Sequence, residues 1–353
     1  MEFKVIILNG HPMNTSMGIL LGDMIESIGD NYEVVTLLNH QLDNETYPGK
    51  VITGLSLSKL SSFVNYSLRN SIHHRFLKEY KRDKVLFFYV NQSVAPLNHD
   101  VQGALIHDSI EAITKSNLYT DKFLLKWSTS LNLRKFLKFP FLMANSNYVR
   151  DSIYRHGYEG KVDVIYHCVP KHIKKIEGLD KNKLRERLGI PLDKKLILNI
   201  STTTYRKNLG MVKRIMNKFD NFLLIRVGDQ LELKNSINFK NVSPSVINEL
   251  YNISDVFLFP SLEEGYGRPL VEAMSVGLPI VASDIPIVRE VVGDSACLAD
   301  PNDLNALTDC VSKVIDNSEY YAKRGKEMAK KYTFEDFSDG FRKHLMRVYK
   351  SHD

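Results

Sequence analysis

Short apolar runs alternate with helical patterns along the first part of the chain, and this alternation restricts the fold more than any other feature. A strand pattern at residues 4–8 is followed by a loop at 9–17, an apolar-periodic helix at 18–28 and a second strand at 33–38. Further runs typical of buried strands lie at 85–90, 103–106, 139–144 and 162–165. Strands that alternate with helices predict a parallel sheet with helices on both faces.

The same alternation restarts after Pro170. A charged segment at 179–195 precedes a strand at 196–200, a loop at 201–208, a helix at 209–219 and a strand at 222–227. The last elements predicted are a strand at 256–259, a helix at 269–276 and a strand at 279–282. Because 353 residues exceed the usual size of one hydrophobic core, we expect an α/β protein with two doubly wound, Rossmann-like domains. Such domains bind ligands at the carboxyl ends of their strands, so we expect them to face each other across a cleft.

Composition and charge favour a protein of the cytoplasm. The net charge of +6 is spread along the chain, which favours small anionic partners or a membrane surface over nucleic acid. The three cysteines, Cys168, Cys297 and Cys310, lack metal-ligand spacing and predict neither a disulfide framework nor a zinc site. The start MEFKVIILNG carries a strand pattern without a cationic leader, and no apolar run approaches ~18 residues.

The most informative segment is FLFPSLEEGYGRPLVEAMSVGLPIVASDIPIVREVVGD, residues 257–294. A strand leads into a glycine-containing loop, Pro269 suits the first position of a helix, and Gly277 closes that helix. Exposed N–H groups of this turn, together with the helix dipole, predict an anion site at the top of the sheet. Glu264 in the loop and Glu272 in the helix are eight residues apart, so both can face one ligand while contacting different parts of it.

This segment resembles the signature of the family 4 retaining glycosyltransferases of the GT-B fold, in which two glutamates are separated by seven residues within PS-x-x-EG-[FY]-G-x-P-x-x-EAM-x-x-G-x-P. The resemblance implies that Glu272 holds the ribose hydroxyls of a nucleotide-sugar donor and that Glu264 faces the donor sugar. It also implies contacts from the turn to the sugar and phosphates, through Gly265, Tyr266, Gly267, Pro269 and Leu270.

A second match is TTTYRKNLG, residues 202–210, at the start of the first helix of the C-terminal domain. In the family, R-K-N at this place puts a lysine on the diphosphate, which implies that role for Lys207 with Arg206 beside it. Many members also have an arginine six residues before the lysine, where this chain has Ser201. The phosphate contacts are therefore expected to depend more on Arg206 or Arg268.

In the N-terminal half, ALIHDSI at 104–110 resembles the family's His-Asp motif, whose histidine reaches toward the donor sugar. His107 is the candidate, and a purely structural hydrogen-bonding role is the alternative. The nearby His99–Asp100 pair raises a metal site as another alternative. Asp-x-Asp occurs nowhere in the chain, so we expect metal-independent chemistry without a cofactor.

Weaker resemblances follow the order of the chain. NGHPMNTSMGILL fits the family's first loop and implies that Gly18 packs against the donor phosphates, and it lacks the G-x-G-x-x-G of dehydrogenases. Cys168 replaces the glycine of the usual linker. We expect an acceptor-binding domain at 1–168, a donor-binding domain at 169–332, and a C-terminal helix at 333–353 that crosses back to the first domain.

The function implied is transfer of a hexose, with retention of configuration, from a nucleotide-sugar to a glycan or lipid-linked acceptor. R-K-N and the E-G-Y-G-R-P turn are most similar to the mannosyltransferase-like branch, which favours GDP-mannose over a UDP-sugar. The basic and aromatic run at 122–141 suggests peripheral contact with the inner membrane surface, and a helix followed by a core strand is the alternative. Rival functions are a catalytically silent nucleotide-sugar-binding partner of another transferase, a nucleotide-sugar epimerase, and a phosphorylase that would need pyridoxal phosphate.

Overall fold

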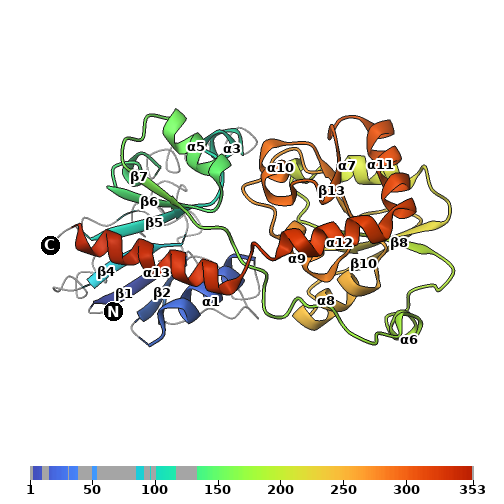
Figure 1. Cartoon of the computed structure of the whole chain (residues 1–353), viewed down its shortest axis with the longest axis horizontal. Helices are drawn as coiled ribbons and strands as arrows, with labels where there is room; N and C mark the ends of the chain where they lie inside the picture. Colours follow the sequence, from blue (N-terminus) through green and yellow to red (C-terminus); the bar gives the residue numbers. More distant parts are fainter. Residues whose placement is uncertain are drawn as a thin grey trace, which may run out of the picture. The chain divides into compact units, whose positions relative to one another are not determined.

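A computed structural model of the chain describes residues 3–9, 16–30, 32–38, 50–53, 85–90, 96, 101–116 and 133–351. Close contacts divide the chain into two units, one formed by Met1–His167 with Phe334–Asp353 and the other by Cys168–Thr333. Each unit contains its own parallel sheet (Figure 1). The prediction of an α/β protein built on two doubly wound sheets is confirmed.

The first unit is built on a seven-stranded sheet in the order β3-β2-β1-β4-β5-β6-β7. Its strands are β1 (Lys4–Asn9), β2 (Tyr32–Leu38), β3 (Lys50–Thr53), β4 (Val85–Tyr89), β5 (Gln102–Ile106), β6 (Phe141–Ala144) and β7 (Lys161–Val164). The helices described in this unit are α1 (Ser16–Ile28), α3 (Ile110–Ser116), α5 (Asn147–Arg155) and the last helix of the chain, α13 (Phe334–Lys350). The strand order reverses between β1 and β4.

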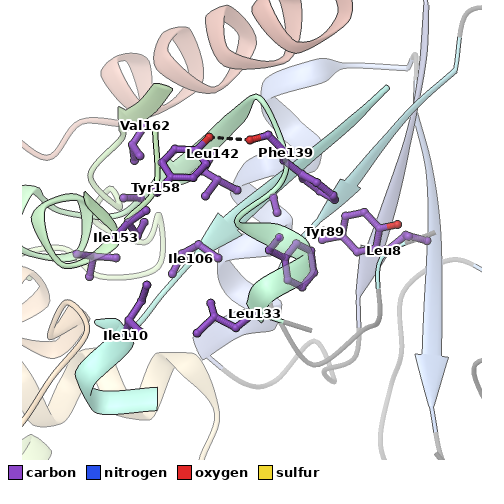
Figure 2. Close-up of a cluster of buried hydrophobic side chains, with 14 of the residues drawn as sticks. Leu8, Tyr89, Ile106, Ile110, Leu133, Phe139, Leu142, Ile153, Tyr158 and Val162 are labelled. Carbon is purple, nitrogen blue, oxygen red and sulfur yellow. Dashed lines mark hydrogen bonds between the residues drawn. The ribbon is translucent and has the colours of Figure 1, made fainter. Parts of the chain in front are cut away.

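Alternate residues of the central strands enter two separate cores in this unit. One face of the sheet places Leu8, Tyr89 and Ile106 in an apolar cluster, which Figure 2 shows together with side chains from α3 and α5. Tyr158 completes this cluster, and its hydroxyl donates a hydrogen bond to the Phe139 carbonyl at 2.9 Å. The buried hydroxyl is therefore satisfied inside an otherwise apolar core.

Helix α13 covers the other face. The ring of Phe341 packs edge-on against Phe88 of β4, with ring centroids 5.1 Å apart. His344 is buried and its Nδ1 lies 2.9 Å from Oδ2 of Asp163 on β7, while Arg347 pairs with the other carboxylate oxygen. Burial alone would raise the pKa of Asp163, but His344 and Arg347 outweigh it and the pKa is lowered. This ion cluster joins the C-terminal helix to the sheet of the first unit.

The second unit has a six-stranded sheet in the order β10-β9-β8-β11-β12-β13. Its strands are β8 (Lys195–Ile200), β9 (Phe222–Val227), β10 (Ser236–Phe239), β11 (Val256–Phe259), β12 (Ile280–Ser283) and β13 (Ala296–Ala299). Its helices are α6 (Lys181–Arg187), η3 (Tyr205–Lys207, a 3-10 turn), α7 (Leu209–Met216), α8 (Pro244–Ile253), α9 (Arg268–Val276), α10 (Pro286–Val292), α11 (Leu304–Asp316) and α12 (Ser318–Ala329). The order reverses between β8 and β11, where Val256 and Phe257 pair with Ile197 and Leu198.

Two sequence expectations need correction. Cys297 on β13 and Cys310 on α11 form a disulfide, although their spacing predicted none, because α11 packs on the sheet and brings the two Cα atoms within 5.6 Å. The strand expected to begin at Phe139 begins at Phe141, because Phe139 and Pro140 form a bend. None of the helices in the described part of the chain combines the length and the apolar character needed to cross a bilayer.

Candidate functional site

The candidate site lies in the second unit, where the loops after β8 and β11 leave neighbouring strands. In open α/β sheets, the point at which the strand order reverses is the usual place for a ligand. The two loops are tied together by a main-chain hydrogen bond of 2.7 Å from the Leu262 N–H to the Arg206 carbonyl. Residues about sixty positions apart in the sequence therefore meet at one edge of the sheet.

The loop after β8 takes a shape that presents its basic residues. Tyr205–Lys207 form a single 3-10 turn, and Asn208 then adopts the left-handed conformation with φ of 52° before α7 begins. Asparagine tolerates this conformation better than most residues with a side chain. The Asn208 side chain donates a hydrogen bond of 2.9 Å to the Pro301 carbonyl, which holds the turn against the segment after β13.

Lys207 and Glu264 form the central contact of the site. Lys207 Nζ lies 2.5 Å from Glu264 Oε1, and Arg206 Nη1 lies 3.7 Å from Glu264 Oε2. The side chains of Lys207 and Glu264 are only 12% and 5% exposed. The Lys207 ammonium also lies 5.6 Å from the centre of the Phe259 ring, within the range of a cation–π contact. One carboxylate therefore faces two cations.

The turn after Glu264 is buried and tightly folded. Gly267 precedes α9 with φ of 88°, and a Cβ at this position would lie 2.8 Å from Leu270 Cδ1, so only glycine fits. The Leu270 N–H donates to the Gly267 carbonyl at 2.8 Å, and Pro269 has no N–H. Gly265 and Tyr266 are buried beside them. The main-chain N–H groups of this turn that remain for the predicted anion contact are therefore those of residues before Pro269.

Glu272 lies on α9 among polar partners that the sequence did not predict. Its Oε2 accepts a hydrogen bond of 2.8 Å from the Tyr251 hydroxyl of α8, and its Oε1 lies 3.7 Å from Nε of Arg268. Burial raises the pKa of Glu272, although Arg268 and the Tyr251 hydroxyl favour the charged form. The positive charge of Arg268 therefore compensates the negative charge of Glu272. To bind the phosphates, as the sequence led us to expect, Arg268 would have to give up this pairing.

In the first unit, His107 directly follows β5 and is half-buried. Its Nε2 lies 2.5 Å from the Val90 carbonyl, which can only accept, so Nε2 carries the proton. The Asn145 side chain donates to the His107 carbonyl at 2.9 Å, and the His167 ring lies 5.7 Å from the His107 ring, centroid to centroid. The histidine is thus held in a fixed orientation at the carboxyl edge of its sheet.

Gly18 is a buried residue in the first turn of α1. Most of the loop before it, residues 10–15, lies outside the described residues, as do His99, Asp100 and the 122–132 part of the basic and aromatic segment. Within the described ranges, no group of three or more His, Cys, Asp or Glu residues is placed to hold a metal ion.

Residues 180–331 match the family described as "Glycosyl transferases group 1". A curated relative, O-antigen chain mannosyltransferase B of Escherichia coli, is 38% identical over 90 residues, which cover 25% of this chain and 24% of that protein. The aligned part therefore spans about a quarter of the relative's length.

Solved structures of similar fold extend over nearly the whole chain. Sucrose-phosphate synthase from Thermosynechococcus elongatus aligns with a TM-score of 0.77 at 15% identity and covers 99% of this chain and 100% of that one. Anabaena HepE in complex with UDP-glucose aligns with a TM-score of 0.76 at 17% identity and covers 98% and 100%. Both units have the doubly wound fold of the GT-B type, and the match to the group 1 glycosyltransferase family covers residues 180–331, which contain both signature loops.

Proposed function

We propose that this protein is a retaining, metal-independent glycosyltransferase that moves a hexose from a nucleotide-sugar donor to a glycan or lipid-linked acceptor. The observation that carries the proposal is the contact between Lys207 and Glu264, which come from the two loops where the strand order reverses. A lysine suits a diphosphate, and a carboxylate suits the hydroxyls of a sugar. A nucleotide-sugar contains both groups side by side.

The donor would replace contacts that the side chains make with one another. Lys207 and Arg206 would turn from Glu264 to the diphosphate, and Glu264 would then accept hydrogen bonds from the sugar hydroxyls. Glu272 would accept hydrogen bonds from the ribose, in the role that its position in the signature implies. Gly18 of the first unit would allow the phosphates to approach the start of α1.

In the proposed reaction, the bond between the sugar C1 and the diphosphate oxygen breaks while a new bond forms between C1 and the acceptor oxygen. The acceptor hydroxyl loses its proton to the departing phosphate on the same face of the sugar, which retains the configuration. Lys207 and Arg206 would stabilise the charge that develops on the leaving diphosphate. His107, whose Nε2–H faces a main-chain carbonyl, would act at the donor sugar from the first unit.

GDP-mannose is the donor that we favour, since a curated relative with 38% identity is a mannosyltransferase by its description. A UDP-sugar is the second candidate, because the similar structure of HepE was determined with UDP-glucose. We further propose that the first unit binds the acceptor and that the protein acts in the cytoplasm, with residues 122–141 touching the inner membrane surface.

The test is to incubate the purified protein with GDP-mannose and with UDP-sugars, with and without a metal chelator, and to measure slow donor hydrolysis. Release of GDP or UDP that persists with the chelator and is lost in Lys207→Ala is expected. Lys218→Ala, which changes an exposed lysine of the same unit, serves as the matched control and keeps the parental rate. Donor binding without hydrolysis or transfer would indicate the silent partner, and interconversion of sugars would indicate the epimerase.

A further inference from the structure

Arg226 is a fully buried cation near the end of β9. Its side chain is 0% exposed, and among the described residues it heads the completely buried side chains in volume. Arginine is almost never buried to this degree without a charged partner. The packing of a strand alone therefore does not account for a buried arginine at this position.

The hydrogen bonds of Arg226 go to neutral groups. Its Nη2 donates to the Ser201 carbonyl at 2.5 Å, and its Nη1 donates to the Val227 carbonyl and, at 3.5 Å, to the Asn199 carbonyl. Within the described part of the chain, no carboxylate forms an ion pair with Arg226, and its Nε has no hydrogen-bond partner. Carbonyl oxygens satisfy N–H groups but do not neutralise the charge, and the negative charge of Asp229 offsets the cost of burial only in part.

The main chain is shaped to hold this guanidinium. Gly228, two residues after Arg226, has φ of 134°. A Cβ on Gly228 would lie 2.3 Å from the Ser201 oxygen and 2.9 Å from Nη2 of Arg226. Only glycine permits this approach, so the end of β9, the start of the next loop and the arginine form one fitted unit.

Arg226 contacts the main chain at the end of β8 and at the start of the loop that carries Lys207. The Asn199 carbonyl belongs to the end of β8, and Ser201 is the first residue after that strand, in the segment that leads to the 3-10 turn. The family that the sequence resembles often has an arginine at the position of Ser201. Here a guanidinium from β9 reaches the main chain of that same residue.

We propose that Arg226 is a positioning residue and a third cation of the donor site. Its side chain holds the start of the 201–208 loop, and its positive charge is compensated by the diphosphate of the donor. This inference rests on the proposed function, because it assumes that the loop binds a nucleoside diphosphate. Burial lowers the pKa of Arg226, opposed by the charge of Asp229, but a guanidinium stays protonated in proteins. The charge is therefore present at every pH at which the protein is studied.

The test compares Arg226→Met, Arg226→Lys and a matched control by calorimetric titration with GDP, UDP and the corresponding nucleosides. The control is Arg185→Met. Arg185 is also buried and donates to the Lys194 and Ile253 carbonyls, but it pairs with Asp255 at 3.4 Å and lies at the opposite, amino ends of the strands. Circular dichroism checks that each variant is folded.

Arg226→Met is expected to bind the nucleoside diphosphate about tenfold more weakly, with nucleoside affinity unchanged, because only the phosphates respond to the lost charge. Arg226→Lys is expected to stay within about threefold of the parent, since it keeps the charge. Arg185→Met is expected to lose stability but not nucleotide affinity. A folded Arg226→Met with parental diphosphate affinity, or an equal loss for nucleoside and diphosphate, would overturn the inference.

If Arg226→Met does not fold, Arg226→Lys decides, and a loss of more than about tenfold in diphosphate affinity refutes the role of the charge. A parent protein that binds neither GDP nor UDP would instead refute the proposed function, and the inference with it. The two failures are thus distinguished by the parent titration alone.

Discussion

Replacing Tyr251 by phenylalanine removes the hydrogen bond from α8 to Glu272, together with a longer contact of 3.4 Å from the same hydroxyl to the Pro269 carbonyl. Tyr251 is buried, and its hydroxyl donates to Glu272 Oε2 at 2.8 Å. The ring packs against Phe257 with centroids 5.8 Å apart, and phenylalanine keeps that contact. A hydrogen bond to a charged group contributes about 1.5–3 kcal/mol, so we expect Tyr251→Phe to lower the free energy of unfolding by about 2 kcal/mol when Glu272 is ionised.

The loss of stability caused by Tyr251→Phe depends on pH. Burial raises the pKa of Glu272 in the folded protein above its ordinary value of 4.5. The folded state therefore binds more protons than the unfolded state above that value, and stability falls as the pH rises through the folded pKa. Tyr251→Phe removes a donor that favours the charged carboxylate, so the folded pKa moves further up. Below 4.5 the carboxyl is protonated in both states, and the variant loses only a neutral hydrogen bond of about 1 kcal/mol.

The assay is urea denaturation of the parent and the variant at pH values from about 4 to about 9. Tyr332→Phe is the matched control, because the Tyr332 hydroxyl donates to the neutral Val291 carbonyl at 2.7 Å and its loss should not vary with pH over this range. The same destabilisation of Tyr251→Phe at every pH, or none at all, would refute the account of Glu272 as a buried carboxylate held by Tyr251.

Three further outcomes are expected. Lys207→Ala should weaken binding of the nucleoside diphosphate by about 1.5–3 kcal/mol and leave nucleoside binding unchanged, and equal losses in a calorimetric titration would place the phosphates elsewhere. His107→Ala should lower kcat for transfer while keeping nucleoside diphosphate affinity, and a parental rate in a steady-state assay would exclude a role in the reaction. Asp163→Asn should cost about 2 kcal/mol of stability at neutral pH by leaving the His344 and Arg347 partners unsatisfied. Because the pKa of Asp163 is lowered below 3.8, its contribution is present above that value and is lost as the pH falls through the folded pKa, so denaturation curves of parent and variant should converge in acid.

Most strands could be predicted from the sequence, because a strand that is buried on both faces requires a continuous apolar run. β9, with the sequence FLLIRV, and β11 were predicted at their observed bounds, and β8 within one residue. The strands that the sequence did not predict are β3, β10 and β13, and all three lie at sheet edges. An edge strand pairs on one side only and is covered less, as the SINF sequence of β10 with its half-buried side chains illustrates. Its pattern therefore lacks the continuous run.

The residue types of the candidate site could also be proposed from the sequence, since Lys207 and the signature loop with both glutamates follow one another along the chain. The residues that contact them in the fold could not be predicted. Tyr251, Arg226 and the Cys297–Cys310 disulfide carry no local pattern, and each acquires its contact only when strands and helices distant in sequence pack together. Local sequence determines backbone periodicity and turn chemistry, because these depend on neighbouring residues. The pairing of a buried charge depends on what the rest of the fold brings to it, and only the tertiary structure contains that information.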